Sequence, residues 1–152
     1  MTKHRVLIAF LFTIASLGLA QNAAAACTLD ISAADMLVFD KTSLEVERSC
    51  GEVTVNFKHT GQLAKTVMGH NWVLVASADD IQPVAMDGMA AGIDNSYVKP
   101  GDPRVLAASD VIGAGESTSV TFSLDTLTAS EYTYFCSFPG HWAMMKGTLT
   151  IK

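Results

Sequence analysis

The sequence predicts an all-β sandwich that carries one short helical insertion around residues 77–92. Several short segments alternate apolar with polar side chains, and Gly and Pro separate them. One stretch between these segments lacks the alternation and is rich in Ala, Asp and Met. Short strands with turn signals between them pack as two sheets, and a single helix then fits as a flap on the outside.

The strand segments differ in pattern. Val53 to Phe57 and Val120 to Leu124 alternate, as half-buried strands do, whereas Trp72 to Val75 is a continuous apolar run that indicates a fully buried strand. Tyr132 to Phe135 and Thr148 to Ile151 combine aromatic, β-branched and apolar residues, which strands favour. Turn signals fill the gaps, at Gly61, Pro100-Gly101, Gly113, Gly115 and Pro139-Gly140.

The helical insertion is predicted from composition. Ala76 to Ala91 has no period of two. Pro83 lies inside this stretch, so it either stands in the first turn of the helix or breaks it.

The N-terminus has the order of a secretory signal peptide. Basic Lys3 and Arg5 precede the apolar run Val6 to Leu19, and small residues follow. We expect a signal peptide over residues 1–24, with cleavage after Ala24, Ala25 or Ala26, and a single domain over residues 25–152. An uncut membrane anchor is the weaker alternative, because the apolar run is short for a bilayer. A periplasmic location follows, with no membrane span in the mature chain.

The mature chain is acidic. Loss of Lys3 and Arg5 lowers Lys+Arg from 10 to 8 against 15 Asp+Glu, so the formal charge moves from −5 to −7. An acidic chain without a basic stripe is a poor nucleic-acid binder, so we expect no nucleic-acid partner.

Three cysteines remain after cleavage, namely Cys27, Cys50 and Cys136. In an oxidising compartment two of them should form a disulfide, and the third then needs a reason to stay unpaired.

The loop Cys136 to Met145 supplies that reason. Cys136, His141 and Met145 lie in it, and Pro139-Gly140 allows a tight turn that brings their side chains together. His70 stands far upstream, at the start of the buried strand segment. Two imidazoles, one thiolate and one thioether match the trigonal His₂Cys copper site with a weak axial Met, which transfers electrons.

The copper site leaves Cys27 and Cys50 to form the disulfide. A lipid-modified Cys27 is the rival interpretation, but the leucine usual before such a cysteine is missing and Cys50 would then have no partner.

With these motifs the chain resembles the azurin family of bacterial cupredoxins, and the resemblance covers essentially the whole mature sequence. The resemblance is strongest in Val67 to Leu74 and in Cys136 to Leu149, and the Cys–His–Met spacing is the azurin spacing. Further landmarks are Asp87-Gly88-Met89, Lys99-Pro100 and Gly113-Ala114-Gly115-Glu116. A bulky Trp142 after the histidine is a local departure.

The resemblance implies an eight-stranded Greek-key sandwich of the cupredoxin type and one copper ion that cycles between Cu(II) and Cu(I). It implies a weak contact from the Gly69 carbonyl opposite Met145, and it selects Met145 rather than Met144 as the axial ligand. Asn71 would tie the two copper loops together, with Phe138 also beside the ligands. His59 is either a titrating group near the site or a satisfied histidine at a strand edge.

The function expected is a monomeric one-electron carrier between respiratory or denitrification-type partners, such as c-type cytochromes or a nitrite reductase. It is not an enzyme, because the four donors leave no open metal position and neither copper loop contains an acidic base. A copper carrier would favour exposed, exchangeable Met- or Cys-rich motifs. Electrons would pass at His141 through an apolar docking patch formed by Met68, Phe138, Pro139 and Trp142, with Leu63 as a further candidate.

Overall fold

The computed structural model describes residues 27–152, so the predicted signal peptide and its cleavage site lie outside the described residues. Eight strands form two sheets, as predicted. The first sheet has the order β1-β3-β6 and the second the order β2-β8-β7-β4-β5. The strands are β1 (Thr28–Ala33), β2 (Ser43–Val46), β3 (Glu52–His59), β4 (Val73–Val75), β5 (Val105–Ala108), β6 (Ser117–Ser123), β7 (Glu131–Phe135) and β8 (Lys146–Ile151).

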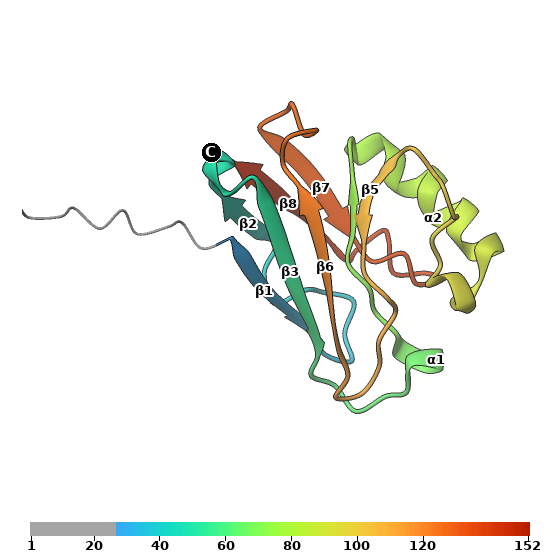
Figure 1. Cartoon of the computed structure of the whole chain (residues 1–152). Helices are drawn as coiled ribbons and strands as arrows, with labels where there is room; N and C mark the ends of the chain where they lie inside the picture. Colours follow the sequence, from blue (N-terminus) through green and yellow to red (C-terminus); the bar gives the residue numbers. More distant parts are fainter. Residues whose placement is uncertain (1–26) are drawn as a thin grey trace, which may run out of the picture.

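Both sheets mix parallel and antiparallel pairs. β1 pairs in parallel with β3, and β2 pairs in parallel with β8, whereas the other neighbours are antiparallel. The short helix α1 (Lys65–Met68) lies at one end of the sandwich, and the C-terminus lies at the opposite end (Figure 1).

The core lies between the sheets because alternate strand residues point inward. Val53, Val55 and Phe57 of β3 are fully buried, as their alternation predicts, and Trp72 lies at the centre. The Trp72 ring stacks on Tyr134 and on Phe122, with ring centroids 5.5 and 5.9 Å away.

The predicted helical insertion is confirmed as the 3₁₀ turn η2 (Ala78–Asp80) followed by α2 (Ile81–Ala91). Pro83 falls in the first turn, where a missing N–H costs no helical hydrogen bond. Ile81, Val84 and Ala85 pack against the outward-facing Val73, Val75 and Phe135 of the second sheet. α2 therefore covers that sheet on the side away from β1 and β3 (Figure 1).

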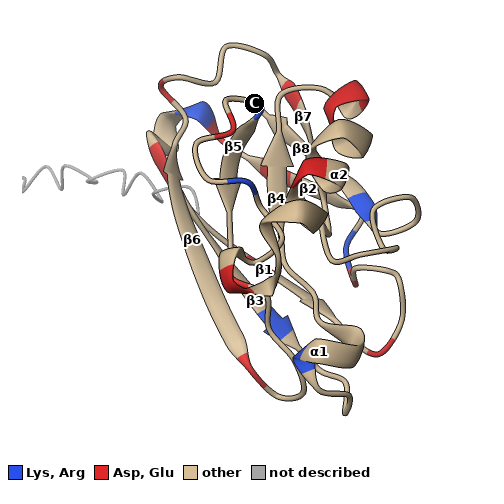
Figure 2. Cartoon of the chain, turned by 90° about the vertical axis from the view of Figure 1, so that its right-hand side faces the viewer, with Lys and Arg blue, Asp and Glu red and all other residues tan. Residues whose placement is uncertain are grey.

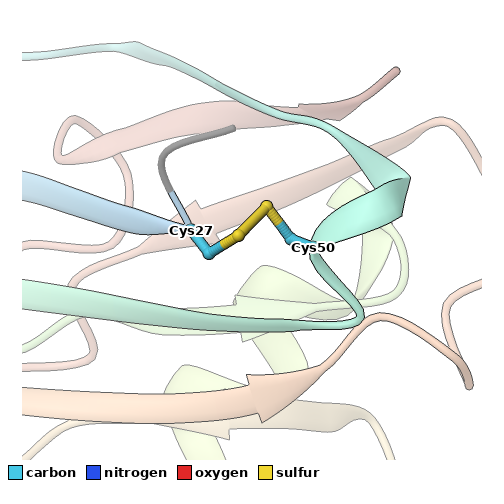
Figure 3. Close-up of a disulfide and its surroundings, with 2 residues drawn as sticks. All are labelled: Cys27 and Cys50. Atoms are coloured by element: carbon cyan, nitrogen blue, oxygen red, sulfur yellow. A yellow bond between two sulfur atoms is a disulfide. The ribbon is translucent and has the colours of Figure 1, made fainter. Parts of the chain in front are cut away.

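The end that holds the C-terminus carries the predicted disulfide. Cys27 precedes β1 and Cys50 closes the 3₁₀ turn η1 (Arg48–Cys50) before β3 (Figure 3). Arg48 also reaches across and donates to the carbonyls of Leu124, Leu127 and Ala129. This end is held by a covalent link and by bonds to backbone.

Charged residues of both signs are scattered along the described part of the chain, with Lys and Arg interspersed among Asp and Glu (Figure 2). Within residues 27–152, no helix has the length and apolar character needed to cross a membrane.

Candidate metal centre

The loop between β7 and β8 is closed by its own backbone. The N–H of Cys136 donates to the carbonyl of Met145 at 3.0 Å, so the first and last residues of the loop meet. The His141 carbonyl accepts from Met144 and Met145, and Gly140 adopts φ +86°, which favours glycine. This turn directs the side chains of Cys136 and His141 toward the same point.

His70 comes from the other side of the site. It lies three residues before β4 rather than at the first position of the strand, and it forms an isolated backbone bridge with Ile112. Both bridging hydrogen bonds are present, at 3.0 and 2.9 Å. The bridge fixes the His70 backbone, as a ligand position requires.

The nitrogen and sulfur atoms of His70, Cys136 and His141 all lie within 4.8 Å of one another. Cys136 Sγ is 3.8 Å from Nδ1 of His70 and 3.6 Å from Nδ1 of His141, and the two Nδ1 atoms are 3.2 Å apart. All three side chains are buried. The described structure thus brings together the predicted His₂Cys set, and its donors fit one copper ion.

Hydrogen bonds orient the His70 ring. Its Nε2 lies 2.8 Å from the carbonyl of Ala34, so this nitrogen donates and Nδ1 faces the site. The ring of His59 stacks on it at a centroid distance of 5.0 Å. His59 is itself fully buried, and its nitrogens contact the Met68 carbonyl and the Gly61 N–H. Sequence reasoning missed the Ala34 carbonyl, which carries no side-chain signal.

Burial keeps the metal-free donors uncharged. It raises the pKa of the Cys136 thiol to about 12. Burial, followed by the charge of His70, lowers the pKa of His141 to about 4. Burial likewise lowers the pKa of His70. Near neutral pH both imidazoles are unprotonated and can bind a metal ion directly. The thiol, in contrast, must release its proton when it binds the metal.

Asn71, one of the two residues predicted beside the ligands, links the copper loops. Asn71 Oδ1 accepts the Ser137 N–H at 2.8 Å, and Asn71 Nδ2 donates to the Ser137 hydroxyl at 2.8 Å. The backbone groups of Asn71 and Phe138 partly offset the effect of burial, because both act to lower the pKa of the Cys136 thiol. The Phe138 ring lies 4.7 Å from the His141 ring. Ser137 was missed by sequence reasoning, although its position next to Cys136 was a usable signal.

The adjacent methionines have opposite environments. Met145 is fully buried in the main core, whereas Met144 is 71% exposed. Gly69 is buried beside His70, and a Cβ there would lie 2.3 Å from the Lys65 carbonyl. Only a glycine allows this close approach of the backbone.

The residues predicted for the docking patch are unequally exposed. Met68 and Pro139 are half-buried, and Phe138 is 7% exposed. Trp142 is half-buried and packs against the cluster under α2. The large exposed apolar residues at this end also include Met36, Leu63 and Val67. The Asp35 carboxylate joins their loops by accepting the N–H groups of Gln62 and Leu63. Met36 and Val67 were missed, although Met36 opens an apolar Met-Leu-Val run.

Comparison with known proteins agrees with this geometry. The profile of the copper-binding plastocyanin/azurin family matches residues 25–152. The azurin of Bordetella pertussis is 57% identical over 84% of this chain and 85% of its own length. Azurin-1 of Alcaligenes xylosoxydans xylosoxydans is 56% identical over 84% of this chain and 98% of its own.

A solved structure gives the same result. The azurin Az-iso2 of Methylomonas sp. strain J superposes with a TM-score of 0.78 at 46% identity, covering 83% of this chain and 98% of that one. Its fold confirms the predicted cupredoxin-type sandwich. With a matching family profile, relatives of this identity and a buried His₂Cys group, the chain belongs to the plastocyanin/azurin family of copper-binding proteins.

Proposed function

We propose that this protein is a periplasmic blue-copper electron carrier whose ion is held by His70, Cys136, His141 and, more weakly, Met145. One observation carries the proposal: two neutral imidazoles and one thiol converge within 4.8 Å in the protein interior. The copper supplies the one-electron Cu(II)/Cu(I) chemistry. The protein supplies the ligands, excludes water and fixes the geometry.

The axial assignment rests on burial. Met145 is fully buried and its backbone closes the copper loop on Cys136, whereas Met144 is exposed to solvent. The Gly69 carbonyl adjoins His70 and is the proposed fifth, weak contact. Thioether and carbonyl oxygen are both poor ligands, so a trigonal His₂Cys plane would dominate the site.

A rigid site suits electron transfer better than turnover of a substrate. The copper loops are linked by Asn71 and Ser137, and the His70 ring is anchored on the Ala34 carbonyl. Ligands fixed in this way need little rearrangement when the oxidation state changes. Four side-chain donors also leave no open position for a substrate, so a metal-dependent enzyme is the weaker alternative.

Electrons would pass through the end of the sandwich that holds His141, which is 6% exposed. The proposed docking patch consists of Met68, Phe138, Pro139 and Trp142, and the exposed Leu63, Val67 and Met144 extend it. The partners would be redox proteins such as c-type cytochromes or a nitrite reductase. They would meet a monomer released to the periplasm by removal of the predicted signal peptide.

The test is titration of the metal-free protein with Cu(II). We expect an intense blue colour from charge transfer between Cys136 sulfur and copper, at one copper per chain. Cys136→Ala should fold and remain colourless. A Cys136→Ala protein that turned equally blue, or a parent protein that stayed colourless, would refute the ligand set.

A further inference from the structure

Ser96 and Tyr97 have an unusual backbone conformation. Their φ angles are +52° and +51°, and in the described chain they are the non-glycine residues with positive φ. They follow the 3₁₀ turn η3 (Ile93–Asn95), where the chain leaves the α2 flap. A left-handed conformation is unfavourable for residues that carry a Cβ, so it persists only where the surrounding structure holds it.

The Ser96 carbonyl joins the two copper loops. It accepts from Asn71 Nδ2 at 2.8 Å and from the Ser137 hydroxyl at 3.4 Å. Asn71 directly follows His70, and Ser137 directly follows Cys136. The same carbonyl oxygen therefore contacts the residue next to each of two proposed ligands.

The Ser96 hydroxyl reaches a third segment of the site. It accepts the N–H of Val111 at 3.0 Å. Val111 precedes Ile112, whose backbone forms the bridge with His70. One residue of the flap thus binds three of the chain segments that lie around the His70–Cys136 pair.

The left-handed turn is held from both sides. On the α2 side, Gly88 packs so closely that a Cβ there would lie 2.0 Å from the Tyr97 carbonyl oxygen. The Tyr97 N–H donates to the Gly92 carbonyl at 3.0 Å. On the copper side, the Tyr97 ring meets the Phe138 ring edge-on at 5.3 Å. The turn connects the flap mechanically to the copper loop.

We propose that Ser96 is a positioning residue for the copper site and acts through Asn71 and Ser137. This inference rests on the ligand set proposed above. Asn71 directly follows the ligand His70, Ser137 directly follows the ligand Cys136, and polar groups around the cysteine sulfur tune the reduction potential of a blue-copper site. The Ser96 carbonyl anchors the side chains of Asn71 and Ser137 and thereby fixes the polar backbone next to both ligands. Loss of the anchor loosens this polar surrounding of the sulfur and lowers the potential.

The experiment compares copper-loaded Ser96→Gly, Ser96→Asn and Ala90→Gly proteins with the parent. Ser96→Gly removes the hydroxyl and frees the turn, whereas Asn tolerates left-handed φ. Ala90→Gly is the matched control, because it weakens α2 at an exposed position outside this network. We expect Ser96→Gly to shift the Cu(II)/Cu(I) equilibrium about threefold toward Cu(II), with a changed copper hyperfine splitting. Ser96→Asn and Ala90→Gly should keep the parent values within error.

Two further measurements test the inference, one on the copper-loaded protein and one on the metal-free protein. Gly88→Ala must displace the Tyr97 carbonyl, so it should lower the potential in the same direction as Ser96→Gly. In the metal-free protein, Ser96→Gly should speed amide hydrogen exchange at Ser137 and Val111, whereas Ala90→Gly should leave these amides protected.

The possible results separate the two proposals. A colourless parent protein refutes the ligand set before any variant is made. A blue parent whose Ser96→Gly variant has an unchanged potential and unchanged exchange at Ser137 and Val111 overturns the positioning role alone. Equal effects of Ser96→Gly and Ala90→Gly would also overturn it, because the flap would then act through general stability.

Discussion

The two ends of the sandwich are stabilised by different means. The end that carries Cys27 and Cys50 relies on a disulfide and on Arg48 bound to three carbonyls. The copper end relies on buried polar side chains, including His59, His70, Asn71 and Ser137, that bond to one another and to backbone. A covalent link restricts the unfolded chain, whereas a buried polar network fixes side-chain directions. The disulfide end should therefore determine stability, and the copper end should determine redox properties.

The largest effect expected from this division is at the disulfide. The double variant Cys27→Ser/Cys50→Ser should lose about 3 kcal/mol of unfolding free energy, because the bridge closes a loop over a sequence separation of 23 residues. Its blue colour and reduction potential should match those of the parent. Denaturant unfolding, visible spectra and voltammetry measure the three quantities.

A thiol titration provides the control for that experiment. The unfolded metal-free parent should show one reactive thiol, from Cys136, and the double variant should show the same number. If the double variant shifted the potential as well as the stability, the two ends would be coupled and the division would fail.

The second prediction asks whether the copper end also carries the docking patch. Trp142→Lys places a charge beside His141, and we expect electron self-exchange to slow about tenfold, because two like charges must approach and an apolar contact is lost. The half-buried Trp142 ring also packs on the α2 cluster, so a loss of about 1–2 kcal/mol of stability is expected. The colour should be unchanged.

Met144→Lys is the matched control for Trp142→Lys. It adds the same charge at a side chain that is 71% exposed, so it should slow exchange without loss of stability. If Trp142→Lys loses stability and exchanges electrons at the parent rate, Trp142 belongs to the packing under α2 and the patch is centred elsewhere.

The sequence predicted the copper end better than its supports. Cys136 and His141 were recognisable because a cysteine and a histidine at this spacing, in one loop of an exported chain, are typical of a metal site. The buried run after His70 indicated a rigid position. Strands β3 and β6 were predicted because one face is buried and the alternation is clear. The strands β1, β2 and β5 were not individually predicted, because short edge segments such as Ser43–Val46 are stabilised by pairing with distant residues rather than by their own pattern.

The supports of the site left weaker signals. The Ala34 carbonyl and the left-handed Ser96 act through backbone atoms, which any residue type provides. The packing of Trp142 on α2 depends on where the helix crosses the sheet, and sequence alone does not specify that crossing. Side-chain chemistry was thus readable from the sequence, whereas backbone contacts over long sequence separations required the structure.

The smallest effect expected is a change of potential at the axial position. Met145→Leu replaces the thioether by an apolar group of similar volume in a fully buried place, so the fold should persist with a loss below about 1.5 kcal/mol. The trigonal His₂Cys plane remains, so the blue colour should persist too. Loss of the weak thioether donor removes some of the stabilisation of Cu(II) and makes the surroundings of the copper more apolar. The reduction potential should therefore rise by roughly 59 mV, which is a tenfold change in the one-electron equilibrium. Met144→Leu, at the exposed neighbour, should leave colour, stability and potential unchanged. Voltammetry of the two variants tests which methionine is axial. If the potential changes in Met144→Leu and stays constant in Met145→Leu, our axial assignment to Met145 is wrong.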